Sequence, residues 1–216
     1  MENPAPPVPV DRFRPQSLVW LALTVMIFVV VLIARSQQPV SLDPITLERL
    51  GFVSLRDVVS IDDVELIDTE GHRVGTEVFS QKWSLVFFGF TSCPDICPTT
   101  MGVLRRVIAE MGTISPQVIF VSVDPERDTP EILRQYVQAF DPSIVALTGA
   151  MEKLKNFSHQ MQTTFARSSE DEYYSVDHSA NIALINPDGE FVGYFKIPHR
   201  EEMIVKTLLA INGVKE

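Results

Sequence analysis

The sequence predicts an α/β domain whose first part is a parallel sheet and whose end is antiparallel. Two continuous apolar runs, residues 85–90 and 117–123, are typical of central strands buried on both faces, and a helical pattern follows each. Near the end of the chain, the turn sequence NPDG at residues 186–189 joins two further strands in a hairpin. Strands that alternate with helices and close in a hairpin indicate an α/β domain.

Periodicity assigns the individual elements. Strands are expected at residues 64–68, 85–90, 117–123, 143–148, 180–185 and 190–195. Helices are expected where apolar residues recur every three or four positions, which is the case at residues 99–112, 130–140, 150–164 and 200–211. Gly112 can end the first of these helices. Thr129 and Pro130 suit the N-cap and the first position of the second.

An apolar segment precedes this domain. Residues 17–34 carry no charged side chain, and as a helix they would span roughly 27 Å, close to the ~30 Å of a hydrocarbon core. We expect an uncleaved single-pass transmembrane helix. A cleavable signal peptide and a buried core helix are the alternatives. Arg12 and Arg14 favour a cytoplasmic N-terminus, which puts the rest of the chain outside the cytoplasm.

These observations predict four parts of the chain. They are a disordered tail at residues 1–16, the transmembrane anchor at 17–34, a linker at 35–60 and the folded domain at 61–216. The net charge of -10 and the isoelectric point near 4.9 exclude nucleic acid as an expected partner. An acidic surface suits either docking on a basic partner or plain solubility.

Cys93 and Cys97 are the only cysteines of the 216 residues, and they lie directly after the first apolar strand. A dithiol between a strand and a helix in such a domain points to a thioredoxin-like architecture. Three residues separate the two cysteines, whereas thioredoxins have two. On a helix this spacing puts the Cβ atoms roughly 5–6 Å apart, wider than the ~3.8 Å of a disulfide. The spacing therefore tolerates a metal ion at least as well as a disulfide.

The prolines around the cysteines affect the expected backbone. Pro94 suits the first turn after Cys93, but Pro98 would remove a later helical hydrogen bond. We therefore expect an irregular turn and a helix that restarts near Thr99. In either geometry both sulfurs lie near a helix N-terminus, where the helix dipole stabilises thiolates.

Histidine is the natural third ligand, and the chain has four. His72 lies in a turn, His159 in a helical pattern and His199 at the start of the last helix, so structural or solvated roles are expected for these three. His178 precedes the strand 180–185, and in a thioredoxin-like fold this approach loop faces the dithiol. A histidine bonded to the backbone is the alternative there. Two thiolates and one imidazole suit Cu(I), Zn(II) or, with changed geometry, Cu(II). An open site with three ligands favours delivery over storage.

Four ordered blocks resemble the Sco/SenC family. They are FGFTSCPDICPTTM at 88–101, VSVDPERDTP at 121–130, the pair FDP and LTG at 140–142 and 147–149, and VDHS at 176–179. The resemblance covers roughly residues 61–200 and the anchor. It implies a membrane-tethered, thioredoxin-fold copper protein whose ligands are Cys93, Cys97 and His178. Candidate outer-shell groups are Asp95, Asp124 and Asp177.

The resemblance also implies a role in assembling cytochrome c oxidase at the inner membrane. In the first version of this role, the protein is a metallochaperone that delivers copper, as Cu(I) or Cu(II), to the copper A centre of subunit II. The alternative is a thiol–disulfide reductase, with Cys93 and Cys97 as the redox pair, that keeps the subunit II cysteines reduced. An upstream copper donor or thiol reductant would be the second partner. A peroxidase is disfavoured, because Phe90 stands where peroxiredoxins have a threonine three residues before the cysteine.

Overall fold

The computed structural model describes residues 19–21, 23–29, 44–168 and 176–212. The chain divides into two units, residues 1–40 and 41–216. In the first unit, residues 19–21 and 23–29 are helical. Within the described residues, none of the helices has the length and apolar character needed to cross a membrane. The predicted tail and much of the predicted anchor lie outside the described residues, so both remain predictions.

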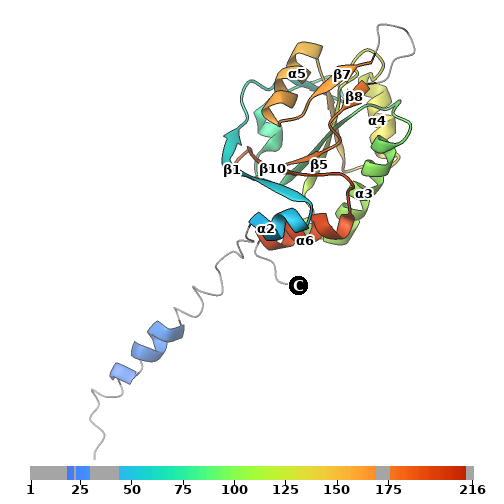
Figure 1. Ribbon diagram of the computed structural model, residues 1–216. Helices are drawn as coiled ribbons and strands as arrows, with labels where there is room; N and C mark the ends of the chain where they lie inside the picture. The colour runs from blue at the N-terminus through green and yellow to red at the C-terminus, as the bar shows by residue number, and fades with distance from the viewer. Residues whose placement is uncertain (1–18, 22, 30–43, 169–175, 213–216) are drawn as a thin grey trace, which may run out of the picture. The chain divides into compact units, whose positions relative to one another are not determined.

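An eight-stranded mixed sheet forms the centre of the second unit (Figure 1). Its strand order is β1-β10-β9-β4-β5-β6-β2-β3. The strands are β1 (Phe52–Ser60), β2 (Leu66–Asp68), β3 (Arg73–Val74), β4 (Ser84–Gly89), β5 (Gln117–Ser122), β6 (Val145–Thr148), β9 (Ile182–Ile185) and β10 (Glu190–Phe195). β4, β5 and β6 are parallel neighbours, whereas β9 and β10 run antiparallel. The predicted parallel centre and antiparallel end are confirmed.

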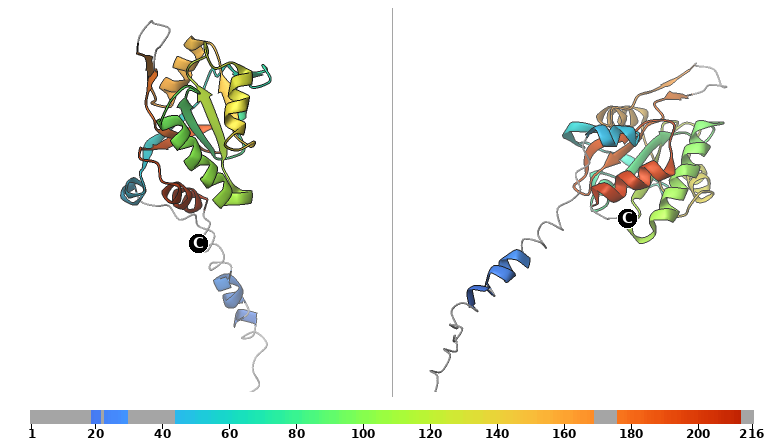
Figure 2. Two further views of the ribbon diagram at one scale, coloured as in Figure 1. Left: turned by 90° about the vertical axis from the view of Figure 1, so that its right-hand side faces the viewer. Right: turned by 60° about the horizontal axis from the view of Figure 1, so that its bottom comes forward.

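The remaining elements surround this sheet. The helices are α2 (Pro44–Arg49), α3 (Ile96–Met111), α4 (Pro130–Gln138), α5 (Met151–Gln160) and α6 (Glu201–Ile211), with the short 3-10 helices η1 (Thr76–Phe79) and η2 (Gly112–Ile114). β7 (Phe165–Arg167) and β8 (Val176–His178) form a separate two-stranded sheet. Figure 1 and the left view of Figure 2 place β7 and β8 at one end of this unit, and α2 and α6 at the other.

The core lies along the central strands. All six residues of β4 and all four of β9 are buried. The Phe88 ring packs on Phe157 of α5 at 5.4 Å between centroids, and Phe87 lies 6.2 Å from Phe120 of β5. In a strand that is buried on both faces, apolar residues do not need to alternate with polar ones. The continuous apolar run of β4 is therefore explained by its position.

The predicted linker at 35–60 is wrong over residues 44–60, which contain α2 and β1. β1 pairs with β10 from Phe52 opposite Phe195 to Ser60 opposite Glu190, so the folded unit begins well before residue 61. The register of β1 shifts between Ser54 and Val59. An irregularity of this kind breaks the two-residue alternation of apolar and polar residues that indicates a half-buried strand. The sequence pattern therefore does not predict β1. β3, β7 and β8 are two or three residues long and were also missed.

Replacing Phe52 with alanine tests whether β1 belongs to the core. The Phe52 ring is 3% exposed and lies 4.8 Å from the Phe195 ring. Loss of a buried aromatic ring leaves a cavity, so we expect Phe52→Ala to lower the free energy of unfolding by about 3 kcal/mol in denaturant titrations. Val58→Ala on the same strand is the control. Because Val58 is 51% exposed, its change should stay within about 0.5 kcal/mol. Equal effects of both variants would contradict this placement of β1.

Candidate metal centre

The connection from β4 to α3 carries both cysteines. Cys93 lies in this connection and is partly exposed, whereas Cys97 lies in the first turn of α3 and is fully buried. The backbone N–H of Cys97 donates to Sγ of Cys93 at 3.5 Å, so the fold brings the two residues together. Cys93 is therefore partly accessible to a partner, whereas Cys97 is not.

The expected restart of the helix near Thr99 is wrong. α3 begins at Ile96, with Asp95 at its N-cap, and already includes Cys97 and Pro98. Proline is tolerated there because the first-turn N–H groups have no acceptor within the helix. Cys93 precedes the N-cap, so the two cysteines do not occupy positions i and i+4 of one helix. Their approach comes from the turn, in which the Cys93 N–H donates to the Phe90 carbonyl at 3.3 Å.

Gly89, the last residue of β4, makes room for Cys97. An ideal Cβ at Gly89 would lie 2.9 Å from Sγ of Cys97 and 2.8 Å from Cε2 of Phe120, and real Cβ atoms essentially never show contacts this short. Burial raises the pKa of the Cys97 thiol, and a hydrogen bond from the backbone of Phe90 opposes that shift. The Cys97 thiol is therefore protonated at neutral pH, and a metal ion that binds it must displace the proton.

A buried carboxylate holds the segment before Cys93. Asp128 is fully buried and lies in the loop that follows β5. It accepts hydrogen bonds from Thr91 N–H at 2.9 Å, Thr91 Oγ1 at 2.5 Å and Ser122 Oγ at 2.6 Å. Three donors compensate for the burial of one charge. Because Thr91 is two residues from Cys93, Asp128 fixes the entry to the dithiol.

Sequence reasoning did not single out this Asp128 network. The predicted parallel strands could have indicated it, because the carboxyl ends of neighbouring parallel strands lie at the same edge of a sheet. Polar residues after β4 and after β5 are therefore expected to meet.

The predicted outer-shell aspartates differ in position. Asp124 is 2% exposed and pairs with Arg127 Nε at 2.5 Å, and the Arg127 guanidinium lies 5.8 Å from the centre of the Phe90 ring. Asp124 thus supports the loop beside the dithiol. Asp95 is exposed, and its side chain forms no cap hydrogen bond. The side chain of Asp177 lies outside the described residues.

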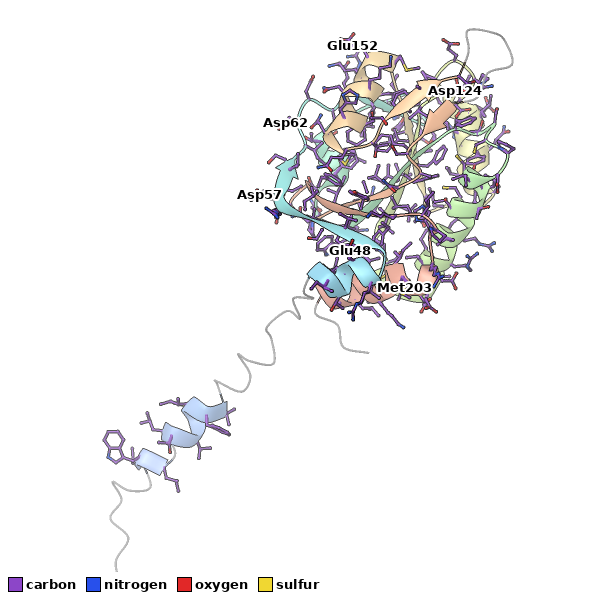
Figure 3. All side chains as sticks on the ribbon, in the orientation of Figure 1. Glu48, Asp57, Asp62, Asp124, Glu152 and Met203 are labelled. Carbon is purple, nitrogen blue, oxygen red and sulfur yellow. The ribbon has the colours of Figure 1, made fainter. Side chains whose placement is uncertain are left out.

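His178 is the last residue of β8, opposite Phe165 of β7. The structure describes its backbone and not its side chain, so its role as a ligand remains a prediction. The backbone leads towards the dithiol: β9 is antiparallel to β4, with Ile182 opposite Phe87. Residues that precede β9 therefore lie at the same edge of the sheet as residues that follow β4. Figure 3 shows Asp124, two residues after β5, towards the same end as β8.

The other three histidines have other surroundings. His72 is exposed, with Nδ1 3.4 Å from the Asp68 carboxylate, and His159 is exposed on α5. His199 is half-buried, and its Nε2 donates to the Ala180 carbonyl at 2.7 Å. Among the described residues, Asp68, Glu70 and His72 bring three potential ligand atoms within 4.8 Å of one another. The backbone N–H groups of Glu70 and His72 already occupy an oxygen of Asp68.

Comparison with known proteins identifies the family. The family model described as SCO1/SenC matches residues 59–212. The chain belongs to the SCO1/SenC family. A protein of Stutzerimonas stutzeri whose name proposes copper binding is 36% identical to this SCO1/SenC chain over 153 residues, which are 69% of this chain and 75% of the relative. The mitochondrial SCO2 homolog of Homo sapiens is 39% identical over 148 residues, 66% of this chain but only 56% of the human protein.

Solved Sco structures share the fold of this SCO1/SenC chain. Arabidopsis thaliana ScoI with copper bound superposes with a TM-score of 0.64 at 31% identity, covering 71% of this chain and 99% of that structure. Yeast Sco1 with copper bound gives 0.60 at 30% identity, with 72% and 87% covered. The predicted family and its mixed α/β, thioredoxin-like fold are confirmed.

Gly89→Ala tests the close fit behind Cys97. We expect the added methyl to displace the sulfur or the Phe120 ring, and to lower the free energy of unfolding by about 1–3 kcal/mol. Iodoacetamide should then label Cys97 faster in the native protein, as measured by peptide mass spectrometry.

Gly102→Ala is the matched control for this variant. A Cβ at Gly102 would meet only Arg106 Nη1 at 3.7 Å. Alanine also suits a helix interior better than glycine, so stability should stay the same or rise. If Gly89→Ala behaved like Gly102→Ala in both measurements, the close fit would be refuted.

Proposed function

We propose that this SCO1/SenC protein is a membrane-anchored copper metallochaperone that delivers copper to the copper A centre of cytochrome c oxidase subunit II. Cys93, Cys97 and His178 would hold the copper. The observation that carries the proposal is the approach of the two cysteines at the carboxyl end of β4, with the Cys97 N–H 3.5 Å from Sγ of Cys93. Two adjacent sulfurs, one of them accessible, form the soft and open donor set that Cu(I) prefers.

The strand register supports His178 as the third ligand. Ile182 lies opposite Phe87 in the antiparallel pair of β9 and β4. β9 begins at Ile182 and β4 ends at Gly89, so His178, four residues before β9, and Thr91, two residues after β4, both leave the sheet at this edge. Thr91 is two residues before Cys93 and is held there by Asp128. An imidazole that approaches from this edge would complete the donor set of the two sulfurs.

The proposed transfer is an exchange of ligands. Copper binding displaces the protons of Cys93 and Cys97, and delivery returns protons to them as thiolates of the acceptor take over the metal. Each copper–sulfur bond that breaks here is replaced by one in the acceptor, so the oxidation state of copper does not change. The buried thiol of Cys97 favours release, because burial stabilises its neutral form over the thiolate.

Relatives support the same assignment. The Arabidopsis and yeast structures contain bound copper. BsSco, a solved Sco protein that is 22% identical to this chain, is described as a member of a family of cytochrome c oxidase assembly proteins. The human SCO2 homolog is named as mitochondrial. With the apolar segment at 17–34, these names support an inner-membrane protein whose domain faces away from the cytoplasm. An upstream copper donor would load the site.

A thiol–disulfide reductase is the second candidate function. The difference in exposure of the two cysteines favours it: Cys93 is accessible to a partner, while Cys97 is buried beneath it. Cys93 would attack a disulfide of subunit II, and Cys97 would then displace the reduced partner from the mixed disulfide. The target gains two electrons, and Cys93 and Cys97 end as a disulfide. A thiol reductant must then restore the pair.

His178→Ala separates the two functions. If copper delivery is the task, we expect copper affinity to fall at least about tenfold, because one of three ligands is lost, while both thiols remain titratable. The rate of disulfide reduction should change little. His159→Ala removes an exposed histidine of α5 and should leave copper affinity unchanged. Unchanged copper affinity in His178→Ala, together with a loss of reductase activity, would reverse the order of the two candidates.

The reductase candidate makes its own prediction for the two thiols. We expect Cys97→Ser to accumulate a mixed disulfide between Cys93 and an oxidised peptide from a copper A site, because the resolving thiol is missing. Cys93→Ser should form no such adduct, since the remaining thiol is buried. Mass spectrometry of the non-reduced protein measures both. Adducts of similar yield in the two variants would show that burial does not distinguish the thiols.

A further inference from the structure

A pocket far from the dithiol is lined by positive charge. It has a volume of about 290 Å³ and lies between the end of α2, the connection from β10 to α6 and the first turn of α6. Its charged and titratable lining residues are Arg49, Lys196, His199 and Arg200, and no acidic residue lines it. The figures place α2 and α6 at the end opposite β7 and β8, and Figure 3 marks the lining residue Met203 there. In a chain with a net charge of -10, this concentration of cations is unusual.

The three cations lack an ion-pair partner in the part of the chain that the structure describes. Neither Arg49, Lys196 nor Arg200 forms an ion pair with any residue that the structure describes. Glu201 begins α6, but its carboxylate pairs with Arg106 of α3. Glu202 and Glu48 are exposed neighbours in the sequence that do not line the pocket. Arg49, Lys196 and Arg200 are all exposed, and no carboxylate of residues 44–168 or 176–212 pairs with them.

The first turn of α6 borders the same pocket. α6 begins at Glu201, and its N-cap, Arg200, provides no side-chain acceptor for the first-turn N–H groups. The Met203 N–H donates to the Arg200 carbonyl at 3.1 Å, so the N–H groups before it are the candidates for a bound anion. The His199 ring also lines the pocket, and its Nε2 donates to the Ala180 carbonyl. Burial lowers the pKa of His199, so the ring is neutral at pH 7 and adds no charge. The charge of the pocket thus comes from two guanidinium groups and one ammonium group.

We propose that this pocket binds a phosphate-bearing anion. The planar donors of Arg49 and Arg200 match phosphate oxygens in pairs, and Lys196 supplies a further point charge. Two sources share this chemistry, free inorganic phosphate and the phosphodiester of an anionic lipid headgroup. The proposal does not depend on copper binding, because the pocket contains neither cysteine nor His178.

Calorimetric titration of the full chain in neutral detergent micelles tests the proposal. The titrants are inorganic phosphate and the soluble lipid dihexanoyl phosphatidylglycerol. We expect at least one to bind, and the double variant Arg49→Gln with Arg200→Gln to weaken that binding roughly tenfold or more, because two charged donors are lost. Binding of phosphate alone assigns a free anion as the source. Binding of the lipid alone assigns a headgroup.

Arg56→Gln is the matched control. Arg56 is an exposed arginine of β1 that has no ion pair among the described residues and does not line the pocket. It should change affinity less than about twofold, since its charge acts only at long range. Copper affinity should be the same in all variants, which confirms that the domain remains folded. Absence of binding for both titrants at millimolar concentration, or equal weakening by Arg56→Gln and the double variant, overturns the proposal.

Discussion

The geometry of the dithiol depends on one buried carboxylate. The parallel strands β4 and β5 end side by side, and their strand pairing does not extend along the loops that follow them. Asp128 joins these loops, because it accepts from Thr91 on one side and from Ser122 on the other. A charge in a low-dielectric interior is costly unless its donors are all in place, so the network has one favourable arrangement. That arrangement fixes the backbone two residues before Cys93.

The second constraint is the absence of a side chain at Gly89. The sulfur of Cys97 occupies the space that a Cβ would need, so Cys97 can be buried while Cys93 remains accessible. This asymmetry suits a site that must give up its cargo. A buried thiol returns readily to its protonated form, and an accessible sulfur can exchange its ligand with a partner. The same asymmetry also defines an attacking and a resolving cysteine, which is why the fold alone supports both candidate chemistries.

The sequence predicted the elements whose signals are local. β4 and β5 are buried on both faces and give continuous apolar runs, and α4 has both Thr129 as a capping side chain and Pro130 at its start. The contact between Thr91 and Asp128 spans 37 positions, and no local pattern reveals it. α3 begins earlier than expected because proline is unfavourable only in a helix interior, whereas Pro98 lies in the first turn. The prediction of Cys93 and Cys97 as ligands rested on their spacing, whereas the prediction of His178 required topology and family resemblance.

The two ends of the domain have different chemistry. α2 is the first element of the folded unit, so the chain enters at the end that carries the cationic pocket, while the dithiol follows β4 towards the end of β7 and β8 (Figure 1). An entering chain at the dithiol end would cover Cys93 and compete with any acceptor for the metal. α2 belongs to the opposite end, and Cys93 is partly exposed. If the pocket binds an anion as proposed, that anion would lie at the end of α2 and α6, away from the end of β7 and β8. The proposed anion site and the proposed copper site share no residue, so a ligand at one would not compete for the side chains of the other.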